Sequence, residues 1–399
     1  MRKVVIIGAG PCGLFTASEL LKNPDIKVEL YDKQRSAGNK FLIAGKSGLN
    51  LTHSETIETL SQKYYEHSEV FLKWLNEFSN QDLIQWANQI GVETFIGSSG
   101  RVFPLQFKAA QMLKIWMDSL KKSENFGFFP NSTLNSIDPA KKTVLVNDEE
   151  IEFDELVLAL GGGSWSKTGS DGMWIETLKK INIRVQDFYS LNCGFNTKWS
   201  QSFSNRFEIM PVKYINVRHG ETEIKGDIML TPWGVEGTPI YSLSHSIQKE
   251  ILENGTGHLE IYIDLKPDLN LEQISEKLKG KKSISTKLKA LLSGQAILLL
   301  RELTSKEDYL DEKIIASKIK NLKLKLTGPR PIEEAISTGG GVDMKEITDN
   351  LSLKNFSNIY VGGEMLSWGA PTGGYLLQGC FTQGYIIAKS IKDKATIIK

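Results

Sequence analysis

The sequence predicts an α/β fold in which both ends of the chain build one parallel sheet, interrupted by an inserted β domain and a small helical domain. The chain opens with the apolar run Val4–Ile7, and comparable runs follow at Leu156–Leu160 and Ile359–Val361, each ending in glycines. Short continuous apolar runs are typical of parallel strands that are buried on both faces. Between about residues 190 and 330 the pattern changes to alternating strands and then to lysine-rich helical segments.

The composition is that of an ordinary globular protein without a strong charge. The chain has 399 residues, enough for two or three domains, and its formal net charge of +1 provides no global attraction to nucleic acid or a membrane. No apolar run approaches the roughly 20 residues that cross a bilayer. Gly8 and Gly10 make the first apolar run too short for a signal peptide, so we expect a cytoplasmic protein.

Cysteine and histidine positions give no sign of a redox relay or a metal. Cys12, Cys193 and Cys380 form no Cys-x-x-Cys motif and lie far apart in the sequence. A dithiol relay and a disulfide framework are therefore not expected. The five histidines show no ligand spacing, and no metal site is predicted.

The amino-terminal segment has the pattern of a dinucleotide-binding βαβ unit. The strand Val4–Ile7 leads into Gly8-x-Gly10-x-x-Gly13, a helix follows, and a second strand ends at Asp32. Gly8 permits the tight turn, Gly10 allows the backbone to approach a pyrophosphate, and Gly13 allows the helix to pack closely on the strand. The helix N-terminus offers free N–H groups to phosphates, and Asp32 can accept hydrogen bonds from a ribose. This unit alone does not distinguish FAD from NAD.

Two later segments repeat the arrangement of a buried strand that ends in glycines. Leu156–Leu160 runs into Gly161-Gly162-Gly163, and Ile359–Val361 runs into Gly362-Gly363-Glu364. Gly373-Gly374-Tyr375 then opens a helix, whose N-terminal N–H groups can meet an electronegative ligand edge. A simple NAD dehydrogenase does not need such a strand near its carboxyl end, whereas a two-dinucleotide flavoprotein holds one FAD with both chain ends. We therefore predict FAD as the bound cofactor.

The triplet Gly45-Lys46-Ser47 looks like the end of a phosphate-binding P-loop, but its spacing excludes that site. A P-loop places a glycine, four residues and then Gly-Lys-Ser or Gly-Lys-Thr after a strand. The upstream glycine in range is Gly38, and six residues separate it from Gly45. We interpret the stretch as a loop beside the flavin, where Lys46 would stabilise a reduced, anionic ring and Asn50 could hydrogen-bond that ring.

The combination of motifs resembles the BaiN-like (HI0933-type) family of NAD(P)/FAD-dependent oxidoreductases, in a little-characterised branch. In that family the loop after the second strand reads Gly-Arg-Lys…Ser-Gly-Gly-Gly-Arg-Cys-Asn, and Lys40, Gly45, Gly48 and Asn50 fit it. The stretches "GRVFPLQFKA", "LALGGGSWSKTGSDG", "GDIMLTPWGVEGTPI" and "TGGYLLQG" match further family blocks, so that the resemblance covers nearly the whole chain.

The resemblance implies a two-dinucleotide-type Rossmann FAD domain and a FAD-dependent oxidoreductase. The enzyme would reduce an unknown small organic acceptor with hydride from NADH or NADPH. Lys46 and Asn50 are candidate catalytic residues, and no catalytic acid or base is identified. Leu49 replaces the family's cysteine and Leu376 its asparagine, which leaves the role of both positions open. The expected cofactor-binding residues are Gly8, Gly10, Pro11, Cys12, Gly13, Asp32, Lys33, Lys40, Gly45, Lys46, Gly48, Asn50, Leu134, Gly161, Gly162, Gly363, Glu364, Gly373, Gly374, Tyr375 and Leu376.

The chain is predicted to divide into four segments. Residues 1–190 form the first part of the FAD domain with a helical cap, 191–265 an inserted β domain, 266–328 a basic helical domain, and 329–399 the final part of the FAD domain. Alternation around a His-Gly turn predicts a hairpin in the β domain, and residues 271–326 have a helical pattern. The sequence contains no second complete GxGxxG unit, so we expect a nicotinamide to bind only transiently.

The predicted helical domain carries an excess of positive charge. Residues 266–330 contain 15 Lys or Arg and 8 Asp or Glu, an excess of seven. A solvated lysine-rich surface is the preferred interpretation, and nucleic acid is not the expected partner, because the aromatic residues on which single strands stack are nearly absent there. Two alternatives stay open: a FAD-containing binding or sensing protein that acts through a partner such as RNA, and an oxidase that uses O₂. The sequence does not predict an oligomeric state.

Overall fold

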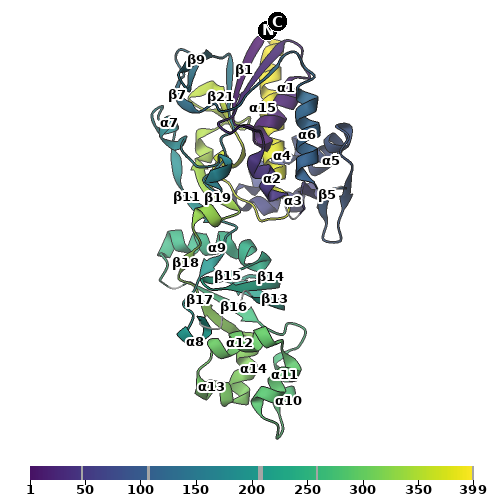
Figure 1. Ribbon diagram of the computed structural model, residues 1–399, viewed down its shortest axis with the longest axis vertical. Helices are drawn as coiled ribbons and strands as arrows, with labels where there is room; N and C mark the ends of the chain where they lie inside the picture. The colour runs from purple at the N-terminus through teal and green to yellow at the C-terminus, as the bar shows by residue number, and fades with distance from the viewer. Residues whose placement is uncertain (46–47, 106–107, 205–209, 258, 398–399) are drawn as a thin grey trace. The chain divides into compact units, whose positions relative to one another are not determined.

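The computed structural model describes residues 1–45, 48–105, 108–204, 210–257 and 259–397, and the chain divides into two compact units. Unit 1 consists of Met1–Tyr189 and Ser337–Lys399, and unit 2 consists of Ser190–Ile336. Figure 1 shows the chain coloured by residue number, with purple and yellow segments of the two chain ends intermixed in unit 1. The sequence analysis drew separate β and helical domains, whereas both of those segments belong to unit 2 and share one apolar core.

The main sheet of unit 1 is built from both ends of the chain, as predicted. Its strand order among the described residues is β20-β21-β10-β1-β2-β6. The pairs β21-β10, β10-β1, β1-β2 and β2-β6 are parallel, and β20 is antiparallel to β21. The strands are β1 (Arg2–Ile7), β2 (Ile26–Tyr31), β6 (Phe126–Phe129), β10 (Glu155–Leu158), β20 (Ser352–Leu353) and β21 (Phe356–Val361).

Helices α1 (Pro11–Leu20) and α15 (Tyr375–Ile397) pack against each other, although they come from opposite ends of the chain. Figure 1 shows the yellow α15 beside the purple α1. Thr16 Oγ1 donates a hydrogen bond to the carbonyl oxygen of Gly384 at 3.2 Å. A Cβ at Gly384 would lie 2.8 Å from the carbonyl oxygen of Cys12, so glycine is needed for this close approach.

An aromatic cluster joins these two helices to the helical cap. The cap contains α4 (Ser68–Glu77), α5 (Asn80–Gln89) and α6 (Ala109–Leu120), in agreement with the amphipathic spacing in the sequence. Phe15, Trp86, Trp116 and Phe381 come from α1, α5, α6 and α15. Their rings are in contact, with distances between ring centroids of 5.0 Å for Phe15–Trp86, 4.8 Å for Trp86–Trp116 and 5.2 Å for Trp116–Phe381. The burial of these large rings holds the cap against α1 and α15.

The other elements of unit 1 are short. Among the described residues no helix combines the length and apolarity needed to cross a bilayer. The remaining strands pair as β3-β5-β4, β7-β8-β9 and β11-β19. The elements are α2 (Asn39–Ala44), β3 (Thr52–His53), α3 (Ile57–Ser61), η1 (Gln62–His67), β4 (Thr94–Ile96), β5 (Arg101–Pro104), β7 (Leu134–Asp138), β8 (Thr143–Val146), β9 (Glu149–Glu152), η2 (Ser166–Thr168), α7 (Ile175–Lys179), β11 (Val185–Leu191), β19 (Ser337–Val342), η4 (Met344–Glu346) and η5 (Gly363–Met365).

Unit 2 contains an antiparallel sheet and a set of helices. The strand order is β17-β16-β13-β14-β15-β12-β18, and β13-β14 is the predicted hairpin. The elements are β12 (Phe195–Asn196), α8 (Gln201–Ser204), β13 (Met210–His219), β14 (Thr222–Thr231), β15 (Gly234–Glu236), α9 (Thr238–Asn254), β16 (Glu260–Asp264), α10 (Leu271–Leu278), α11 (Ile284–Leu291), α12 (Gly294–Glu302), α13 (Lys306–Leu310), α14 (Glu312–Lys320), β17 (Leu322–Lys325), β18 (Gly328–Pro329) and η3 (Ile332–Glu334).

Two elements of unit 2 correct the sequence analysis. The segment expected to be an inserted β domain also contains the helix α9, in which Ile240, Leu243 and Ile247 are buried at helical spacing. The segment expected to be helical up to residue 326 ends in the strand β17, which pairs with β16. Leu322 and Leu324 of β17 are buried and its two lysines are exposed, which is the alternation of a half-buried strand.

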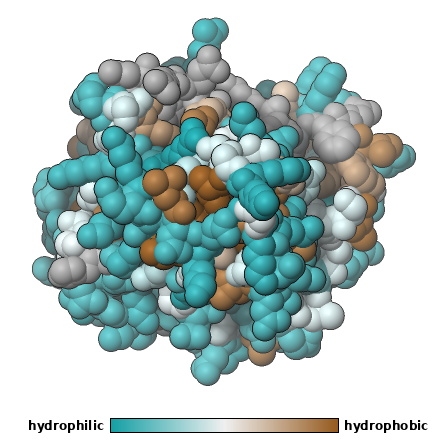
Figure 2. Space-filling view, turned by 90° about the horizontal axis from the view of Figure 1, so that it is seen from below, coloured by the Kyte–Doolittle hydropathy of each residue, from teal (hydrophilic) through white to brown (hydrophobic). Residues whose placement is uncertain are grey.

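Helices α10–α14 give unit 2 a largely polar end. Figure 2 shows the molecule from the end at which Figure 1 places these helices, and hydrophilic side chains cover most of this face around a small apolar area. The large exposed apolar side chains of these helices are Leu271, Leu298, Leu310 and Ile314. Their number is too small to make the face apolar as a whole.

Candidate cofactor site

A cavity of unit 1 lies where the parallel strands end in glycines. It has a volume of about 490 Å³ and is bordered by residues at the carboxyl ends of β1, β2 and β10 and just beyond β21. Open α/β sheets bind ligands at this edge, and the volume falls within the range of about 300–1,000 Å³ usual for ligand sites. The predicted cofactor residues that line it are Gly8, Gly10, Pro11, Cys12, Asp32, Lys33, Lys40, Leu134, Gly161, Gly363 and Glu364.

The three glycines of the first turn have different surroundings. Gly8 has a φ of +109°, and a Cβ there would lie 2.2 Å from the carbonyl oxygen of Ala159 on the neighbouring strand exit. A Cβ at Gly13 would lie 2.0 Å from the carbonyl oxygen of Gly8. A Cβ at Gly10 would meet nothing within 4 Å, although Gly10 lines the cavity. Gly8 and Gly13 are therefore needed for packing, and Gly10 leaves open space beside the N-terminus of α1.

Asp32 stands at the end of β2 with its carboxylate held by the backbone. The N–H of Ala9 donates to Oδ2 at 2.7 Å, and the N–H of Gln34 donates to Oδ1 at 2.8 Å. Burial raises the pKa of Asp32, and these two N–H groups act against that rise. Each carboxylate oxygen keeps acceptor capacity for a ribose hydroxyl. Beside it, Lys33 forms an ion pair of 2.5 Å with Asp171, and both residues line the cavity.

Lys40 and Glu364 form a polar network at another part of the cavity wall. Lys40 Nζ lies 2.5 Å from Glu364 Oε2 and 2.7 Å from Ser164 Oγ. The N–H of Thr338 donates to Glu364 Oε1 at 2.9 Å. The Thr338 hydroxyl accepts from the N–H groups of Gly163 and Ser164, each at 2.9 Å. The network therefore fixes the glycine exits of β10 and β21 against each other.

Two thiols in this wall are neutral. Cys12 and Cys380 both line the cavity, and burial is the main cause that raises both pKa values, that of Cys380 to about 12. A thiol with a raised pKa is a poor nucleophile. We therefore assign them an apolar packing role rather than thiol chemistry.

The donor set of the site fits a flavin dinucleotide. Ser170 Oγ, in the cavity wall, is buried and has no hydrogen-bond partner among the described residues. Oδ1 of Asn50 is also buried and without a partner among the described residues, but Asn50 does not line the cavity. Unpaired buried polar atoms are costly unless a ligand or water completes them. The Ser170 hydroxyl and the open space at Gly10 are consistent with a polar ligand that lies along the glycine turns.

Sequence comparison places the chain among known proteins. A family model described as HI0933-like protein Rossmann domain matches residues 2–390. The chain belongs to the HI0933-like family. It is 21% identical over 427 residues to the 3-dehydro-bile acid delta(4,6)-reductase of Clostridium scindens, with 99% of this chain and 100% of that protein covered. It is 24% identical over 406 residues to the ribosomal RNA dihydrouridine synthase of Haemophilus influenzae, with 97% and 98% covered.

Solved structures support the fold of this HI0933-like chain. The 3-ketosteroid delta1-dehydrogenase from Sterolibacterium denitrificans superposes with a TM-score of 0.54 at 10% identity, covering 99% of this chain and 100% of that chain. A flavocytochrome c3 fumarate reductase gives a TM-score of 0.53 at 13% identity, covering 99% and 78%. At these identities the likeness concerns the fold alone.

Several predicted cofactor residues of the HI0933-like motifs do not line the cavity. Lys46 lies outside the described residues. Gly45 ends α2, and a Cβ there would lie 2.3 Å from the Cβ of Ala109; a Cβ at Gly162 would lie 2.5 Å from Thr338 side-chain atoms. These two glycines allow close packing in the walls. Those absent from the described lining are Gly13, Gly45, Gly48, Asn50, Gly162, Gly373, Gly374, Tyr375 and Leu376, and their contact with a cofactor stays a prediction.

Sequence reasoning missed a titratable cluster at the start of α15. Tyr375 Oη donates to Glu55 Oε2 at 2.9 Å, and His53 Nδ1 lies 3.4 Å from the same oxygen. Lys63 lies 3.7 Å from the other carboxylate oxygen of Glu55, and Gly373 brings the backbone next to the guanidinium of Arg101. Burial and then Glu55 raise the pKa of Tyr375. The "TGGY" motif marked only the tyrosine, because the partners lie more than 250 positions earlier in the chain.

The network around Thr338 was also missed, although its sequence carries a signal. Ser337–Val342 reads Ser-Thr-Gly-Gly-Gly-Val, a further glycine run inside a strand. Glycine inside a strand indicates a close approach by another backbone. Here a Cβ at Gly341 would lie 2.4 Å from the carbonyl oxygen of Met365, and one at Gly340 would lie 2.2 Å from that of Asp187.

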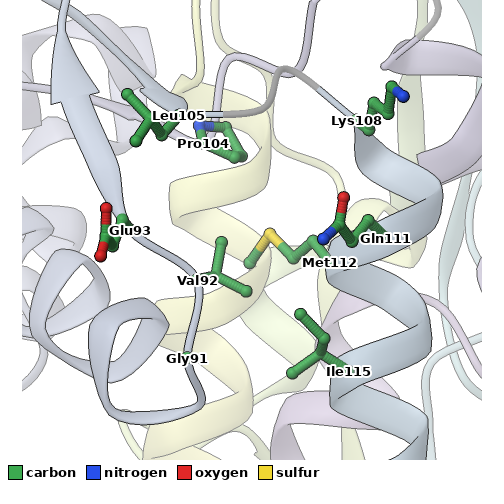
Figure 3. Close-up of a pocket in the computed structure, with 9 residues that line it drawn as sticks. All are labelled: Gly91, Val92, Glu93, Pro104, Leu105, Lys108, Gln111, Met112 and Ile115. Atoms are coloured by element: carbon green, nitrogen blue, oxygen red, sulfur yellow. The ribbon is translucent and has the colours of Figure 1, made fainter.

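A second, smaller cavity of about 180 Å³ lies elsewhere in unit 1. Figure 3 shows it between the Gly91–Glu93 loop, the end of β5 and one side of α6. Val92, Met112 and Ile115 supply much of its wall. It has none of the glycine-ended strands or paired charges of the larger cavity, and we assign no ligand to it.

Proposed function

We propose that the protein is a FAD-dependent oxidoreductase that reduces a carbon–carbon double bond beside a carbonyl group in a small organic acceptor, with NADH or NADPH as electron donor. The observation that carries the proposal is the cavity of about 490 Å³ lined by three glycine-ended strand exits from both ends of the chain. The reaction type is supported by the names of the two relatives, a delta(4,6)-reductase and a dihydrouridine synthase, both of which describe a reduced double bond.

Each part of the wall has a role in holding FAD. The N–H groups at the start of α1 would bind the pyrophosphate beside Gly10. Asp32 would accept hydrogen bonds from the adenosine ribose, and the Lys40–Glu364 pair would orient the part of the cofactor near the exit of β21. Bound FAD supplies the transfer of two electrons and a proton as hydride, which the side chains of the protein cannot perform.

The described residues also hold a proton near the start of α15. Tyr375 Oη is protonated at neutral pH because burial and the Glu55 carboxylate raise its pKa. Reduction of a carbon–carbon double bond requires one proton besides a hydride, and a phenol that is hydrogen-bonded to a carboxylate can hold one in reserve. Tyr375 and Glu55 are therefore the first residues of this chain to test as a proton source.

The decisive experiment is reduction of the reconstituted flavin. The purified protein should take up FAD, show yellow absorbance, and lose that absorbance when NADH or NADPH is added under anaerobic conditions. Return of the colour on addition of an α,β-unsaturated ketone, and not of its saturated analogue, would identify the acceptor class. A protein that takes up no FAD would contradict the whole proposal. Formation of peroxide in air without a nicotinamide would instead show that the protein is an oxidase.

A second candidate function is reduction of a pyrimidine ring in RNA. It is supported by the relative named ribosomal RNA dihydrouridine synthase, which this chain matches over 97% of its length. The excess of positive charge in residues 266–330 is also compatible with an RNA substrate. The two candidates share the flavin chemistry and differ in the acceptor. Restoration of the flavin colour by a uridine-containing RNA, and not by a small ketone, would favour the second.

A further inference from the structure

One continuous segment of unit 2 contains no acidic residues. Residues 277–301, from the end of α10 through α11 and α12, contain six lysines and one arginine and no Asp or Glu. Such a segment has no carboxylates of its own to neutralise its lysines, whereas an ordinary solvated helix carries charges of both signs. We call the exposed side of this segment the lysine face.

The two acidic residues that flank this segment in the sequence, and the one that contacts Lys287, have partners of their own. Glu276 pairs with Lys279 at 2.6 Å, and Glu312 pairs with the buried Lys287. Glu302 accepts hydrogen bonds from the N–H and the hydroxyl of Ser200, at 2.5 and 2.7 Å. These carboxylates therefore do not neutralise the other lysines of the face.

Four lysines of the face have no ion pair within the described residues. Lys277, Lys281, Lys282 and Lys289 are all exposed, and none of them forms an ion pair with a carboxylate among the residues that the structure describes. Lys277 and Lys282 are five positions apart, so they lie at most about 18 Å from each other even along an extended chain. A duplex nucleic acid carries about one negative charge per 1.7 Å of its axis, so several phosphates fit within this span.

The chemistry of the face selects the kind of nucleic acid. No Phe, Tyr or Trp occurs in residues 277–301, and the ring of Tyr309, which contacts this segment, is engaged by the guanidinium of Arg301 at 5.2 Å. The face therefore offers few of the stacking platforms of single-strand binding proteins. Ser283, Ser285 and Thr286 lie between the lysines at the start of α11, and hydroxyl groups can contact both phosphates and 2′-hydroxyls. Double-stranded RNA is recognised through these two groups rather than through its bases.

We propose that the lysine face of unit 2 binds the phosphate backbone of double-helical RNA. Figure 2 looks onto the side of unit 2 that carries α10–α14 and shows mostly hydrophilic side chains there. The proposal extends the second candidate function, because it gives an RNA substrate a docking surface. RNA binding needs no flavin reduction, so the two can fail independently in experiments.

The proposal makes a quantitative prediction about salt. Four lysine–phosphate contacts give a slope of log K against log salt concentration of about −3.6, which lowers the affinity about 100-fold between about 50 and 200 mM salt. In the variant Lys277→Ala/Lys281→Ala/Lys282→Ala/Lys289→Ala, the slope should fall close to zero. The four side chains are exposed, so the melting temperature of this variant should stay at the wild-type value.

A matched control removes the same charge from another part of the same unit. Lys213, Lys225, Lys249 and Lys325 are exposed and lie on the sheet and on α9. The control variant with alanine at these four positions should keep the wild-type slope. Binding of the full-length protein to a fluorescent RNA hairpin of about 20 base pairs, of the same duplex as DNA and of the same strand unpaired gives the comparison by anisotropy.

Each outcome decides the proposal. Tighter binding of the RNA duplex than of the DNA duplex or the single strand, lost in the lysine-face variant and kept in the control, would support it. Equal loss in both variants would overturn it, since net charge alone would then explain the binding. Absence of binding to the RNA hairpin at low salt would also overturn it, as would tighter binding to vesicles of anionic phospholipid, whatever the flavin assay shows.

Discussion

Gly10 is expected to serve cofactor binding and Gly13 to serve folding, and one pair of alanine variants can test this division. Gly10 has a φ of −82°, which any residue can adopt, and its added Cβ meets no atom of the protein within 4 Å. Gly10→Ala should therefore leave the stability of the FAD-free protein unchanged. The new methyl group points into space beside the N–H groups that would bind the pyrophosphate. Loss of one charge-assisted hydrogen bond costs about 1.5–3 kcal/mol, which raises the Kd for FAD about tenfold to 150-fold.

Gly13→Ala should show the opposite behaviour. Its Cβ would lie 2.0 Å from the carbonyl oxygen of Gly8 and 3.3 Å from Cγ2 of Ile6, so α1 must move away from β1. Overpacking of this kind costs about 1–3 kcal/mol or more, and the melting temperature should fall even without FAD. The assay pairs differential scanning fluorimetry of the FAD-free proteins with FAD titration. A Gly10→Ala protein that melts early, or binds FAD as tightly as the wild type, would refute the reasoning.

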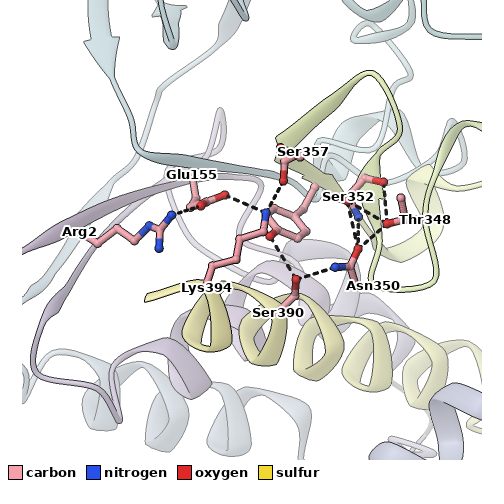
Figure 4. Close-up of polar contacts among 9 residues, drawn as sticks. Arg2, Glu155, Thr348, Asn350, Ser352, Ser357, Ser390 and Lys394 are labelled. Carbon is pink, nitrogen blue, oxygen red and sulfur yellow. Dashed lines mark hydrogen bonds and ion pairs between the residues drawn. The ribbon is translucent and has the colours of Figure 1, made fainter. Parts of the chain in front are cut away.

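Three further predictions concern single side chains. Asn50→Leu removes a buried oxygen that has no partner among the described residues, and such an unpaired oxygen costs about 1–3 kcal/mol. The FAD-free variant should therefore have a higher melting temperature and a lower affinity for FAD than the wild type. If Asn50 had a structural role instead, both the melting temperature and the FAD affinity would fall. Thr338→Val leaves two N–H groups of the β10 exit without their acceptor and should raise the Kd for FAD at least about fivefold, while Thr338→Ser should keep it. Glu155 pairs with Arg2 and Lys394 (Figure 4), but its burial outweighs these ion pairs and raises its pKa. The contribution of Glu155 to stability is therefore present below about pH 4.5 and is lost as the pH rises. In urea titrations, the stability of the wild type relative to Glu155→Gln should fall with rising pH. A difference between wild type and Glu155→Gln that is constant with pH would contradict this assignment.

The features that sequence predicted well depend on neighbouring residues. The Gly8–Gly13 turn, the strand before it and Asp32 after it lie within one short segment, so their spacing alone fixes their relative positions. The shared pattern of a buried run that ends in glycines likewise predicted that the exits of β1, β10 and β21 supply cofactor-binding residues. Eleven of the predicted cofactor residues line the cavity for this reason.

The features that sequence missed depend on contacts between distant residues. Thr338 reaches Gly163 and Ser164 from about 175 positions away, and Tyr375 reaches Glu55 from 320 positions away. No local periodicity records such pairs, because only the packing of the sheet brings them together. The helix α9 was missed for a different reason. It starts directly after a Gly/Pro-rich stretch that is typical of turns, and here Pro239 occupies the first turn of the helix.

One of the two departures from the family pattern lies in the apolar core, and the other packs against it. Leu49 is 1% exposed and belongs to the core cluster of unit 1, and Leu376 packs against the same cluster. Neither residue is among those that line the described cavity. Cysteine is itself among the most buried residue types, so leucine at position 49 preserves an apolar interior. These replacements therefore change packing without removing a group from the cavity wall.

The position of Gly45 explains why Gly45-Lys46-Ser47 is unsuited to a triphosphate. In a P-loop the glycine-rich segment leads into a helix, and the N–H groups and positive dipole end of that helix hold the phosphates. Gly45 instead ends the helix α2 (Asn39–Ala44), with its N–H donating to the carbonyl oxygen of Phe41. The carboxyl end of a helix carries partial negative charge and disfavours anions. The spacing that excluded a P-loop in the sequence and the direction of α2 in the structure thus lead to the same conclusion.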